Sequence, residues 1–360
     1  MRAEIHAAVV GAGYWGTNLI RVLHDTEGMW LKAICDARPE ILQEIRAHHP
    51  QITLTSSYDR ILQDPSIEAV FLATPPTTHS QLARAALAAG KHVWVEKPLA
   101  LAYNDGRELV ALARQRRRIL FVDETFLYDP LVLQARTIIA GGGLGKIYHV
   151  SSERTGMGRI RRDSNVWWNS APHDVSILHY LLKVPVIRVS ATGHAFLQSA
   201  IEDVVWASLR LAGDISAHVY LNWLFPEKRA SLVVVGEQGM IQYEGRFGER
   251  KLIRYKYRLG QISKTSLEEV ACANLIPIEN SEVVEVIHGG RTEPLRLACA
   301  AFRDSIVGGT PAPSSGEYSL HTLAVLEAGA HSLARQGAWE ECATCGSAPS
   351  SIAKKEGLNY

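Results

Sequence analysis

The sequence predicts an α/β protein with two parts: an N-terminal parallel sheet with helices, and a C-terminal α+β domain with an open, mostly antiparallel sheet. Over the first 125 residues, short apolar runs alternate with amphipathic segments, the pattern of strand–helix–strand units on a parallel sheet. After about Thr125, strand-like segments follow one another without intervening helices, which indicates an antiparallel sheet with one covered face. The 360 residues suffice for about two domains.

Strands and helices alternate in order along the N-terminal part. The expected strands are Ala7–Val10, Trp30–Cys35, Ala69–Ala73, His92–Val95 and Ile119–Val122. The expected helices are Tyr14–Leu23, a segment after Pro39, Ser80–Ala89 and Tyr103–Arg114. The third of these helices is expected to end before Gly90, because glycine and a nearby basic residue, here Lys91, are typical of a helix C-terminus.

Strands dominate the C-terminal part until two final helices. The expected strands are Val204–Leu211, Ile215–Trp223 and Ala230–Gly236, and the expected helices are Leu297–Val307 and Leu320–Leu333. We therefore expect a first domain over residues 1–124 and a second over residues 125–337, followed by a polar tail over residues 338–360. A C-terminal helix could pack back on the first domain.

Composition and charge exclude several classes of protein. Hydrophobic residues make up 47% and charged residues 21%, as in an ordinary globular protein. A net charge of +1 gives no basic field for nucleic acid or acidic membranes. The start of the chain lacks the apolar core of a signal peptide, and no run approaches the roughly 20 apolar residues that span a bilayer. We expect a cytoplasmic protein without nucleic-acid or membrane partners.

The five cysteines do not suggest a disulfide framework. Cys35, Cys272 and Cys299 lie in apolar segments and are expected to be buried free thiols. Cys342 and Cys345 form a C-x-x-C pair in the polar tail. A structural metal site would require a second pair with similar spacing, so no metal site is predicted.

The segment AAVVGAGYWGTNLIRVL is typical of a dinucleotide-binding site. Gly11, Gly13 and Gly16 match G-x-G-x-x-G directly after a strand and at the start of a helix. The first glycine permits the tight turn, the second lets the backbone approach a pyrophosphate, and the third allows close helix–strand packing. The helix N–H groups then face the phosphates. Tyr14 and Trp15, between the glycines, are included in the expected cofactor site.

An acidic residue at the end of the second strand supports this interpretation. Asp36 lies 20 residues after Gly16, where a carboxylate binds the adenosine ribose hydroxyls. That carboxylate would repel the 2′-phosphate of NADP, so NAD is the favoured cofactor of a Rossmann domain. Arg38, two residues later, leaves NADP as the less favoured alternative.

Two further strand ends carry candidate cofactor-site residues, since open α/β sheets bind ligands at the carboxyl ends of their strands. The segment ATPPTTH offers Thr74, Pro75, Pro76 and His79, with the prolines expected to hold an extended turn beneath the nicotinamide ribose. His79 could equally be a turn residue. The segment VEKPLAL places Glu96 and Lys97 in a loop at the end of the next strand, near the expected nicotinamide position.

Taken in order, GAGYWG, Asp36, TPPTTH, EKPLAL and PHDVSILHYL resemble the Gfo/Idh/MocA family of sugar oxidoreductases. The resemblance runs from Ala7 to about Leu333. It implies an N-terminal Rossmann domain and a C-terminal domain whose open sheet commonly mediates homo-oligomer formation, as a dimer or tetramer.

The resemblance implies that Lys97 and His173 are the catalytic pair. Oxidation of a secondary alcohol requires a base for the hydroxyl proton, and histidine suits that role near neutral pH. Lys97 would hydrogen-bond the same oxygen and stabilise its developing charge. Asn169 departs from the family pattern, which has an aspartate four residues before this histidine. The alternative for His173 is a polar residue at the start of a buried helix.

Basic and aromatic residues indicate the substrate. The segment GMGRIRRDSN carries Arg159, Arg161 and Arg162, and arginine binds phosphate groups bidentately. The other expected substrate-binding residues are Asn165, Trp168, Asn169, Lys228 and Arg229, with Trp223 or Phe225 available for stacking. The segments RIRRDSNVWWNSAPHD and NWLFPEKR look most like the nucleotide-sugar branch, notably the UDP-N-acetylglucosamine and UDP-glucose 3-dehydrogenases.

The sequence therefore predicts an NAD-dependent dehydrogenase that oxidises a hydroxyl, at C3, of a nucleotide-linked sugar. Two alternatives stay open at this point. One is a dehydrogenase or ketoreductase of a free sugar or cyclitol, which the basic residues disfavour. The other is a non-catalytic NAD-binding sensor on the same fold, which the neutral Asn169 would suit.

Overall fold

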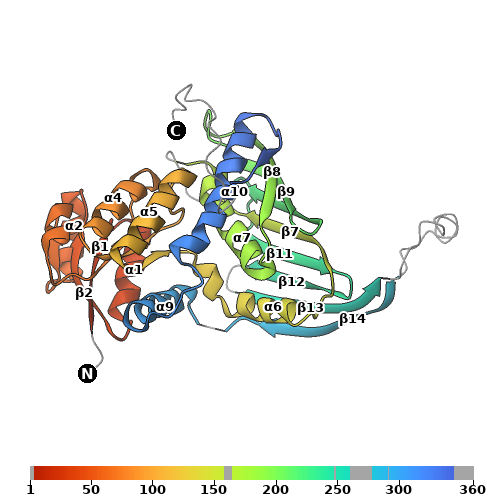
Figure 1. Cartoon of the computed structure of the whole chain (residues 1–360), viewed down its shortest axis with the longest axis horizontal. Helices are drawn as coiled ribbons and strands as arrows, with labels where there is room; N and C mark the ends of the chain where they lie inside the picture. Colours follow the sequence, from red (N-terminus) through yellow and green to blue (C-terminus); the bar gives the residue numbers. More distant parts are fainter. Residues whose placement is uncertain (1–3, 158–163, 247–248, 260–277, 291, 344–360) are drawn as a thin grey trace. The chain divides into compact units, whose positions relative to one another are not determined.

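The computed structural model describes residues 4–157, 164–246, 249–259, 278–290 and 292–343 (Figure 1). The chain divides into two compact units, neither of which is contiguous in sequence. The first comprises Met1–Asp129, Thr292–Glu327 and Ala343–Tyr360, and the second comprises Pro130–Arg291 and Ala328–Cys342. Each unit is built around one sheet.

The first unit contains a six-stranded parallel sheet with the order β3-β2-β1-β4-β5-β6. Its strands are β1 (Ile5–Val10), β2 (Met29–Cys35), β3 (Thr53–Thr55), β4 (Ala69–Leu72), β5 (His92–Val95) and β6 (Leu120–Val122). The chain order reverses between β1 and β4, so the carboxyl ends of these two strands flank the point where such sheets bind ligands. The parallel N-terminal sheet expected from the sequence is confirmed.

Helices connect these strands or follow the last of them in the same unit. They are α1 (Tyr14–His24), α2 (Pro39–His48), α3 (Tyr58–Gln63), α4 (Pro76–Ala88), α5 (Tyr103–Arg116), the 3-10 turn η1 (Thr125–Tyr128), α9 (Pro294–Gly308) and the first part of α10 (Gly316–Ala334). Helix α4 begins four residues earlier than expected, because Pro76 fits the first helical turn, where its fixed φ is favourable and no N–H is needed. The predicted extended turn at Pro75-Pro76 is thus a helix N-terminus.

A buried aromatic cluster fills the core of this unit. Phe71, Trp94 and Phe121 stand on the adjacent strands β4, β5 and β6, with ring centroids 5.2 Å and 4.3 Å apart. Phe302 of α9 lies 5.3–5.7 Å from these three rings, and all four side chains are fully buried. Aromatic contacts of this kind add to the burial of large apolar surfaces, so α9 completes the core of the N-terminal unit.

The second unit contains a nine-stranded sheet with the order β14-β13-β12-β11-β7-β10-β9-β8-β15. The strands are β7 (Ile147–Thr155), β8 (Val186–His194), β9 (Val204–Leu211), β10 (Ile215–Asn222), β11 (Arg229–Gly236), β12 (Gly239–Arg246), β13 (Glu249–Leu259), β14 (Ile278–His288) and β15 (Glu340–Glu341). Strands β7 and β10 are parallel and the other pairs are antiparallel. The expected open, mostly antiparallel sheet is confirmed.

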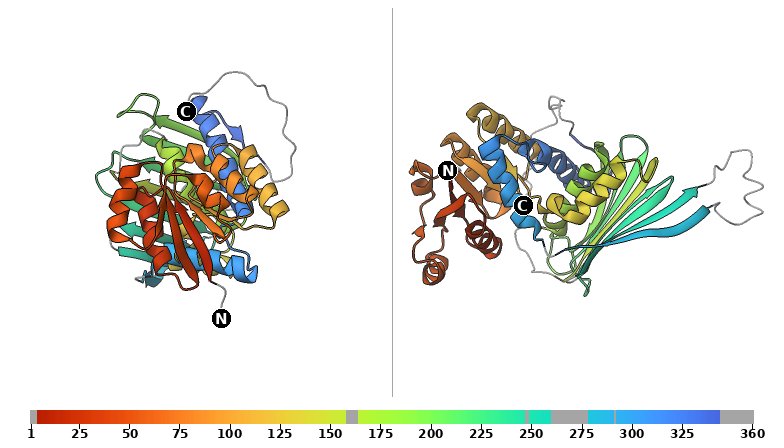
Figure 2. Two further views of the ribbon diagram at one scale, coloured as in Figure 1. Left: turned by 90° about the vertical axis from the view of Figure 1, so that its left-hand side faces the viewer. Right: turned by 90° about the horizontal axis from the view of Figure 1, so that it is seen from below.

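Helices α6 (Pro130–Ala140) and α7 (Val166–Leu182) cover one face of this sheet (Figure 2, right). Along β9, buried Val205, Ala207 and Leu209 alternate with less buried residues, the period expected of a strand with one covered face. The opposite face presents Trp206, which is 47% exposed and stacks on Tyr220 of β10.

Two sequence expectations about organisation differ from the structure. The expected second domain ran continuously over residues 125–337, whereas Thr292–Glu327 belongs to the first unit. The expected polar tail began at residue 338, whereas Glu340 and Glu341 form a strand on β8. None of the described helices combines the length and apolar character needed to cross a membrane.

Candidate functional site

The glycine-rich loop joins β1 to α1 at the carboxyl edge of the first sheet. Gly11 has φ +88°, and a side chain on Gly16 would collide with the Gly11 carbonyl oxygen, so both glycines are required by the turn. Gly13 is the N-cap of α1, and no side chain caps the helix. The N–H groups of the first turn are therefore available to an anionic ligand. Tyr14 is 65% exposed beside this loop.

Asp36 follows β2 and is held in place by hydrogen bonds. Its Oδ2 accepts the Ala12 N–H at 2.8 Å, and the Arg38 guanidinium binds both carboxylate oxygens at 2.9 Å. The Arg38 N–H also donates to Oδ1 at 2.9 Å. Burial raises the pKa of Asp36, but these hydrogen bonds outweigh burial and lower it overall. The acceptor capacity of the carboxylate is thus filled, so a ribose hydroxyl must displace the Arg38 side chain, which is half exposed.

The segment after β4 forms the start of α4, with Thr74, Pro75 and Pro76 at its N-terminus. His79 is 1% exposed, and its ring nitrogens lie 2.8 Å from the Pro98 carbonyl oxygen and 2.9 Å from the Thr74 carbonyl oxygen. Burial lowers the pKa of His79. Both ring nitrogens of His79 thus face backbone groups, which favours the turn role that the sequence left open beside a cofactor contact. His79 ties the start of α4 to the loop after β5.

Glu96 and Lys97 follow β5, as the sequence predicted, and both side chains are half-buried. The Glu96 N–H donates to the Leu72 carbonyl oxygen at 2.9 Å, which continues the strand ladder by one residue. Lys97 thus stands at the carboxyl edge of the sheet that also carries the glycine-rich loop. Such a cation at a strand end can stabilise negative charge on a ligand oxygen.

The sequence analysis missed Asp123, which follows β6 at the same edge. Its side chain is 1% exposed, and Oδ2 accepts the Trp15 indole N–H at 2.6 Å. The Asp123 N–H donates to the Val95 carbonyl oxygen at 2.8 Å, which places Asp123 beside Glu96. The signal that identified Lys97, a polar residue directly after a buried parallel strand, applied equally to this residue.

In the second unit, helix α7 carries Asn169 and His173 one turn apart. Residues four apart lie on the same helix face, and both side chains are half-buried. Every other residue from Val166 to Leu178 is buried. His173 lies inside the helix, not at its start as predicted, because the helix begins at Val166 and continues through Pro172. The helix thus presents an amide and an imidazole on the strip that its packing leaves accessible.

Two predicted substrate-binding residues have structural roles. Asn165 is the N-cap of α7: its Oδ1 accepts the Trp168 N–H at 3.1 Å, and its Nδ2 donates to Glu202 Oε2 at 2.7 Å. Side-chain caps of this kind satisfy helix N–H groups, so this amide is committed to the protein. Trp168 is 6% exposed and belongs to the core.

Asp174, next to His173, is a second residue to which the sequence analysis gave no role. It forms a buried ion pair with Arg154 of β7 and accepts the Ser152 hydroxyl at 2.7 Å. The His-Asp dipeptide drew attention to this segment of the sequence. The buried partner of Asp174, Arg154 on β7, could not be inferred from the sequence. These contacts fix α7 on the sheet.

The predicted arginines Arg159, Arg161 and Arg162 lie outside the described residues. The residues just before them are placed: the Met157 N–H donates to the Phe225 carbonyl oxygen at 2.8 Å. Lys228 is exposed, and Arg229 binds Glu227 Oε2 at 2.6–2.9 Å. The structure therefore brings the start of the arginine segment to the loop that carries Lys228.

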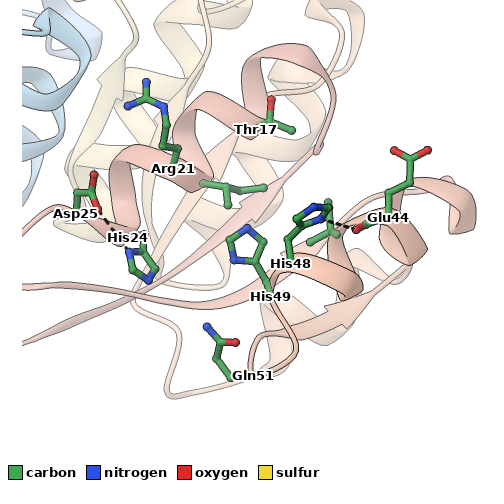
Figure 3. A pocket seen from close by; sticks show the side chains of 10 residues that line it. Thr17, Arg21, His24, Asp25, Glu44, His48, His49 and Gln51 are labelled. Atoms are coloured by element: carbon green, nitrogen blue, oxygen red, sulfur yellow. Dashed lines mark hydrogen bonds and ion pairs between the residues drawn. The ribbon is translucent and has the colours of Figure 1, made fainter.

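A hollow of about 550 Å³ lies between α1 and α2 (Figure 3). His24, His48 and His49 line it together with Arg21 and Glu44. Because α1 starts at the glycine-rich loop and ends at His24, this hollow lies toward the other edge of the sheet. It is therefore separate from the candidate site.

The residues at the carboxyl edge fit a dinucleotide. A Cβ on Gly13 would meet only the Arg38 guanidinium, at 3.7 Å, within 4 Å, so the backbone over the α1 N-terminus is open to a pyrophosphate. Asp36 stands where ribose hydroxyls bind. Within the described ranges, no group of three or more His, Cys, Asp or Glu side chains could hold a metal ion.

Both parts of the chain match known family models. Residues 5–124 match the oxidoreductase family with an NAD-binding Rossmann fold, and residues 132–242 match the GFO/IDH/MocA C-terminal domain. The oxidoreductase YrbE of Bacillus subtilis is 25% identical over 251 residues, 68% of this chain and 71% of its own. YdgJ of Escherichia coli is 30% identical over 196 residues, 52% of this chain and 56% of its own, so the match spans about half of each protein.

Solved structures share the fold of the whole chain. GenD2 from gentamicin A biosynthesis, in complex with NAD, has a TM-score of 0.79 at 20% identity, covering 96% of this chain and 98% of its own. The WlbA dehydrogenase of Bordetella pertussis, in complex with NADH and UDP-GlcNAcA, has a TM-score of 0.76 at 23% identity, covering 95% and 99%. With both domains matched in sequence and the site in place, the chain belongs to the Gfo/Idh/MocA family of oxidoreductases.

Proposed function

We propose that the protein is an NAD-dependent dehydrogenase that oxidises a secondary alcohol, at C3, of a nucleotide-linked sugar. The observation that carries the proposal is the pair Asn169 and His173, which lie one turn apart and half-buried on α7, where the other residues from Val166 to Leu178 are buried. Lys97 at the strand end of the cofactor unit supplies the second polar group.

The chemistry divides between the cofactor and the chain. NAD, which the glycine-rich loop and Asp36 would hold, would supply the hydride acceptor for the carbinol carbon. The hydroxyl proton passes to the His173 imidazole, and a carbonyl group is left on the sugar. The Lys97 ammonium donates a hydrogen bond to the reacting oxygen and stabilises its negative charge. Asn169 donates or accepts a hydrogen bond beside His173 and orients the sugar.

The nucleotide part of the substrate is supported by two observations. Met157, just before the segment with Arg159, Arg161 and Arg162, is hydrogen-bonded to Phe225 of the loop that carries Lys228, and arginine and lysine bind phosphate oxygens. Among proteins with the same fold are WlbA with UDP-GlcNAcA and the UDP-N-acetylglucosamine 3-dehydrogenase GnnA of Acidithiobacillus ferrooxidans, the latter with a TM-score of 0.75 at 18% identity.

A substrate panel tests this function. Purified protein is incubated with NAD or NADP and with UDP-hexoses, UDP-N-acetylhexosamines, free hexoses and inositols, and the absorbance of reduced cofactor is followed. We expect turnover with NAD and at least one UDP-sugar. Turnover with free polyols alone would assign the enzyme to free sugars or cyclitols, and tight NAD binding without any turnover would assign a sensor role.

Two variants test the catalytic residues on the accepted substrate. We expect Lys97→Ala and His173→Ala each to lower kcat by about 100-fold or more. His179→Ala is the matched control, because His179 lies on the same helix and is half-buried but contacts the Val184 carbonyl oxygen at 3.3 Å. Wild-type rates in the Lys97 or His173 variant would contradict the assignment of that residue.

A further inference from the structure

Two carboxyl groups stand side by side next to Lys97. Val95 and Val122 are partners on the adjacent parallel strands β5 and β6, and Glu96 and Asp123 are the next residue of each strand. Their backbone N–H groups donate to the Leu72 and Val95 carbonyl oxygens, so the ladder of the sheet continues through both. Residues in register on neighbouring strands project to the same face. The register of the sheet therefore brings the two acids together.

The side chains of Glu96 and Asp123 lie close enough to interact with each other. Glu96 Oε1 and Asp123 Oδ1 are buried, and no N–H or hydroxyl group in the described part of the chain donates to either. Two ionised carboxylates are both acceptors and cannot form a hydrogen bond. A proton held between the two groups would give both buried oxygens a partner.

Burial and the negative charge of the neighbouring carboxylate both favour protonation of one carboxyl group. Burial, followed by the neighbouring charge of Asp123, raises the pKa of Glu96 well above its ordinary value. Burial raises the pKa of Asp123 to about 6. Like charges this close cannot both ionise at low cost, so the pair keeps one negative charge opposite the single positive charge of Lys97.

Other titratable groups face this pair. Glu124, the next residue after Asp123, is 2% exposed and its charge interacts with Asp123. The Cys299 thiol of α9 is fully buried and also senses the Asp123 charge. Burial keeps both groups neutral at pH 7, because it raises the pKa of Glu124 to about 8 and that of Cys299 well above its ordinary value. Lys97 is thus the cation that balances the pair.

Asp123 connects this pair to the glycine-rich loop. Its Oδ2 accepts the Trp15 indole N–H at 2.6 Å, and Trp15 lies in the first turn of α1, between Gly13 and Gly16. The loop that receives the pyrophosphate and the loop that carries Lys97 are thus joined through one carboxyl group. The aromatic cluster of Phe71, Trp94 and Phe121 holds the strands beneath it.

We propose that Glu96 and Asp123 hold one proton between them, and that this pair, with Trp15, positions the glycine-rich loop and the Lys97 loop for NAD binding. The inference rests on the proposed function only in that NAD is the ligand of these loops. Loss of the shared proton leaves two adjacent carboxylates that repel each other. The connection then weakens, and NAD affinity falls as the pH rises.

Asp123→Asn separates this proposal from a purely structural role. The asparagine Oδ1 still accepts the Trp15 N–H, and its Nδ2 donates to Glu96 in place of the shared proton. We expect NAD binding near the wild-type affinity, without the weakening at high pH that the wild type shows. In Asp123→Ala both connections are lost, and we expect NAD binding to be about tenfold weaker at every pH. Trp15→Phe should weaken binding similarly and serves if Asp123→Ala does not fold.

Calorimetric NAD titrations without substrate, from pH 6 to about 9, measure these affinities. Infrared spectra of the ligand-free protein measure a protonated carboxyl band, which we expect in the wild type at pH 7 and reduced in Asp123→Asn. Glu124→Gln is the matched control for NAD binding, since Glu124 is equally buried, whereas the Trp15 indole donates to Asp123. We expect its NAD affinity to keep the pH dependence of the wild type.

The outcomes are distinguishable. If Asp123→Asn binds NAD as weakly as Asp123→Ala, or keeps the wild-type pH dependence, the shared proton does not position the loops. If the infrared band does not change between the wild type and Asp123→Asn, no proton is shared. A wild type that binds no NAD would overturn both the proposed cofactor and the positioning role. The infrared comparison would then still decide whether the acids share a proton.

Discussion

Arg154 of β7 holds Asp174 of α7 through two contacts, from Nε to Oδ2 at 2.9 Å and from Nη2 to Oδ1 at 3.1 Å. The side chains are only 17% and 4% exposed, and Asp174 is the residue after His173. The position of the predicted base therefore depends on a buried bidentate ion pair between a helix and the sheet beneath it.

Arg154→Met removes one partner of this pair and leaves a buried carboxylate without its cation. We expect the free energy of unfolding to fall by about 3 kcal/mol, measured by urea denaturation. Arg229→Met is the matched control, because the Arg229–Glu227 pair is on the surface and should contribute less than about 1 kcal/mol. Equal effects of the two substitutions would show that the Arg154 pair does not anchor the helix.

Asn169→Asp places a carboxylate one turn before His173. A negative charge there favours the protonated imidazole, so the base becomes neutral only at higher pH. We expect the acid limb of the kcat/KM profile to move up by about one pH unit, measured with the substrate that the panel identifies. An unchanged acid limb would mean that His173 is not the titrating base or that Asn169 does not face it.

Arg38→Ala frees acceptor positions on Asp36 that the guanidinium occupies in the structure. We expect NAD to bind about fivefold more tightly, because ribose hydroxyls no longer compete with Arg38. NADP binding should weaken, since a cation for the 2′-phosphate is lost. Calorimetric titration with both cofactors measures this. Arg21→Ala, which breaks the Arg21–Glu293 pair on the same unit, is the control and should change neither affinity.

Glu124→Gln tests the buried acid beside Asp123. Burial raises the pKa of Glu124 to about 8, whereas an unfolded glutamate titrates near its ordinary value of about 4.3. Between these two pH values the folded state keeps a proton that the unfolded state has lost, so this residue lowers stability as the pH rises. We expect the wild type to lose about 5 kcal/mol more than the variant across this window, measured by urea denaturation at several pH values. Parallel pH dependence of the two proteins would contradict the raised pKa.

Trp206→Glu tests association through the exposed face of the second sheet. We propose that copies of the chain associate there, because Trp206 and Tyr220 form a stacked, partly exposed pair on the face that α6 and α7 do not cover. A buried glutamate would disrupt such an interface. We expect light scattering to report a dimer or tetramer for the wild type and a smaller species for the variant. A monomeric wild type would contradict association.

The parts predicted from sequence were those with local signals. The glycine-rich loop, Asp36 and Lys97 follow buried parallel strands whose apolar runs are continuous, so their places at one sheet edge could be inferred. Strand β7 was not recognised, because buried Ser152 interrupts its apolar alternation, and the partners of that serine, Asp174 and Ser231, lie far away in sequence. The start of α7 was placed too late, since Pro172 resembles a first-turn proline while the true cap is Asn165.

Other parts depended on contacts between distant residues. Asp123 resembles a solvent-exposed residue at a strand end, and only the fold shows that it is buried against Trp15 and Glu96. His79 resembled a cofactor contact for the same reason, although both ring nitrogens face backbone carbonyl oxygens. The sequence pattern indicated where polar residues gather, but not which of them contact other protein groups.

Because helix α9 belongs to it, the N-terminal unit is discontinuous in sequence. Phe302 lies in the aromatic core with Phe71 and Trp94, although some 200 residues of chain separate it from them. A protein cut after residue 129 would keep all six strands and the glycine-rich loop but expose the aromatic surface that Phe302 covers, with a cost of several kcal/mol. Recombination that moves only a continuous N-terminal segment to another protein would therefore leave this unit without α9. A new partner domain would have to be inserted within the unit and return the chain to α9.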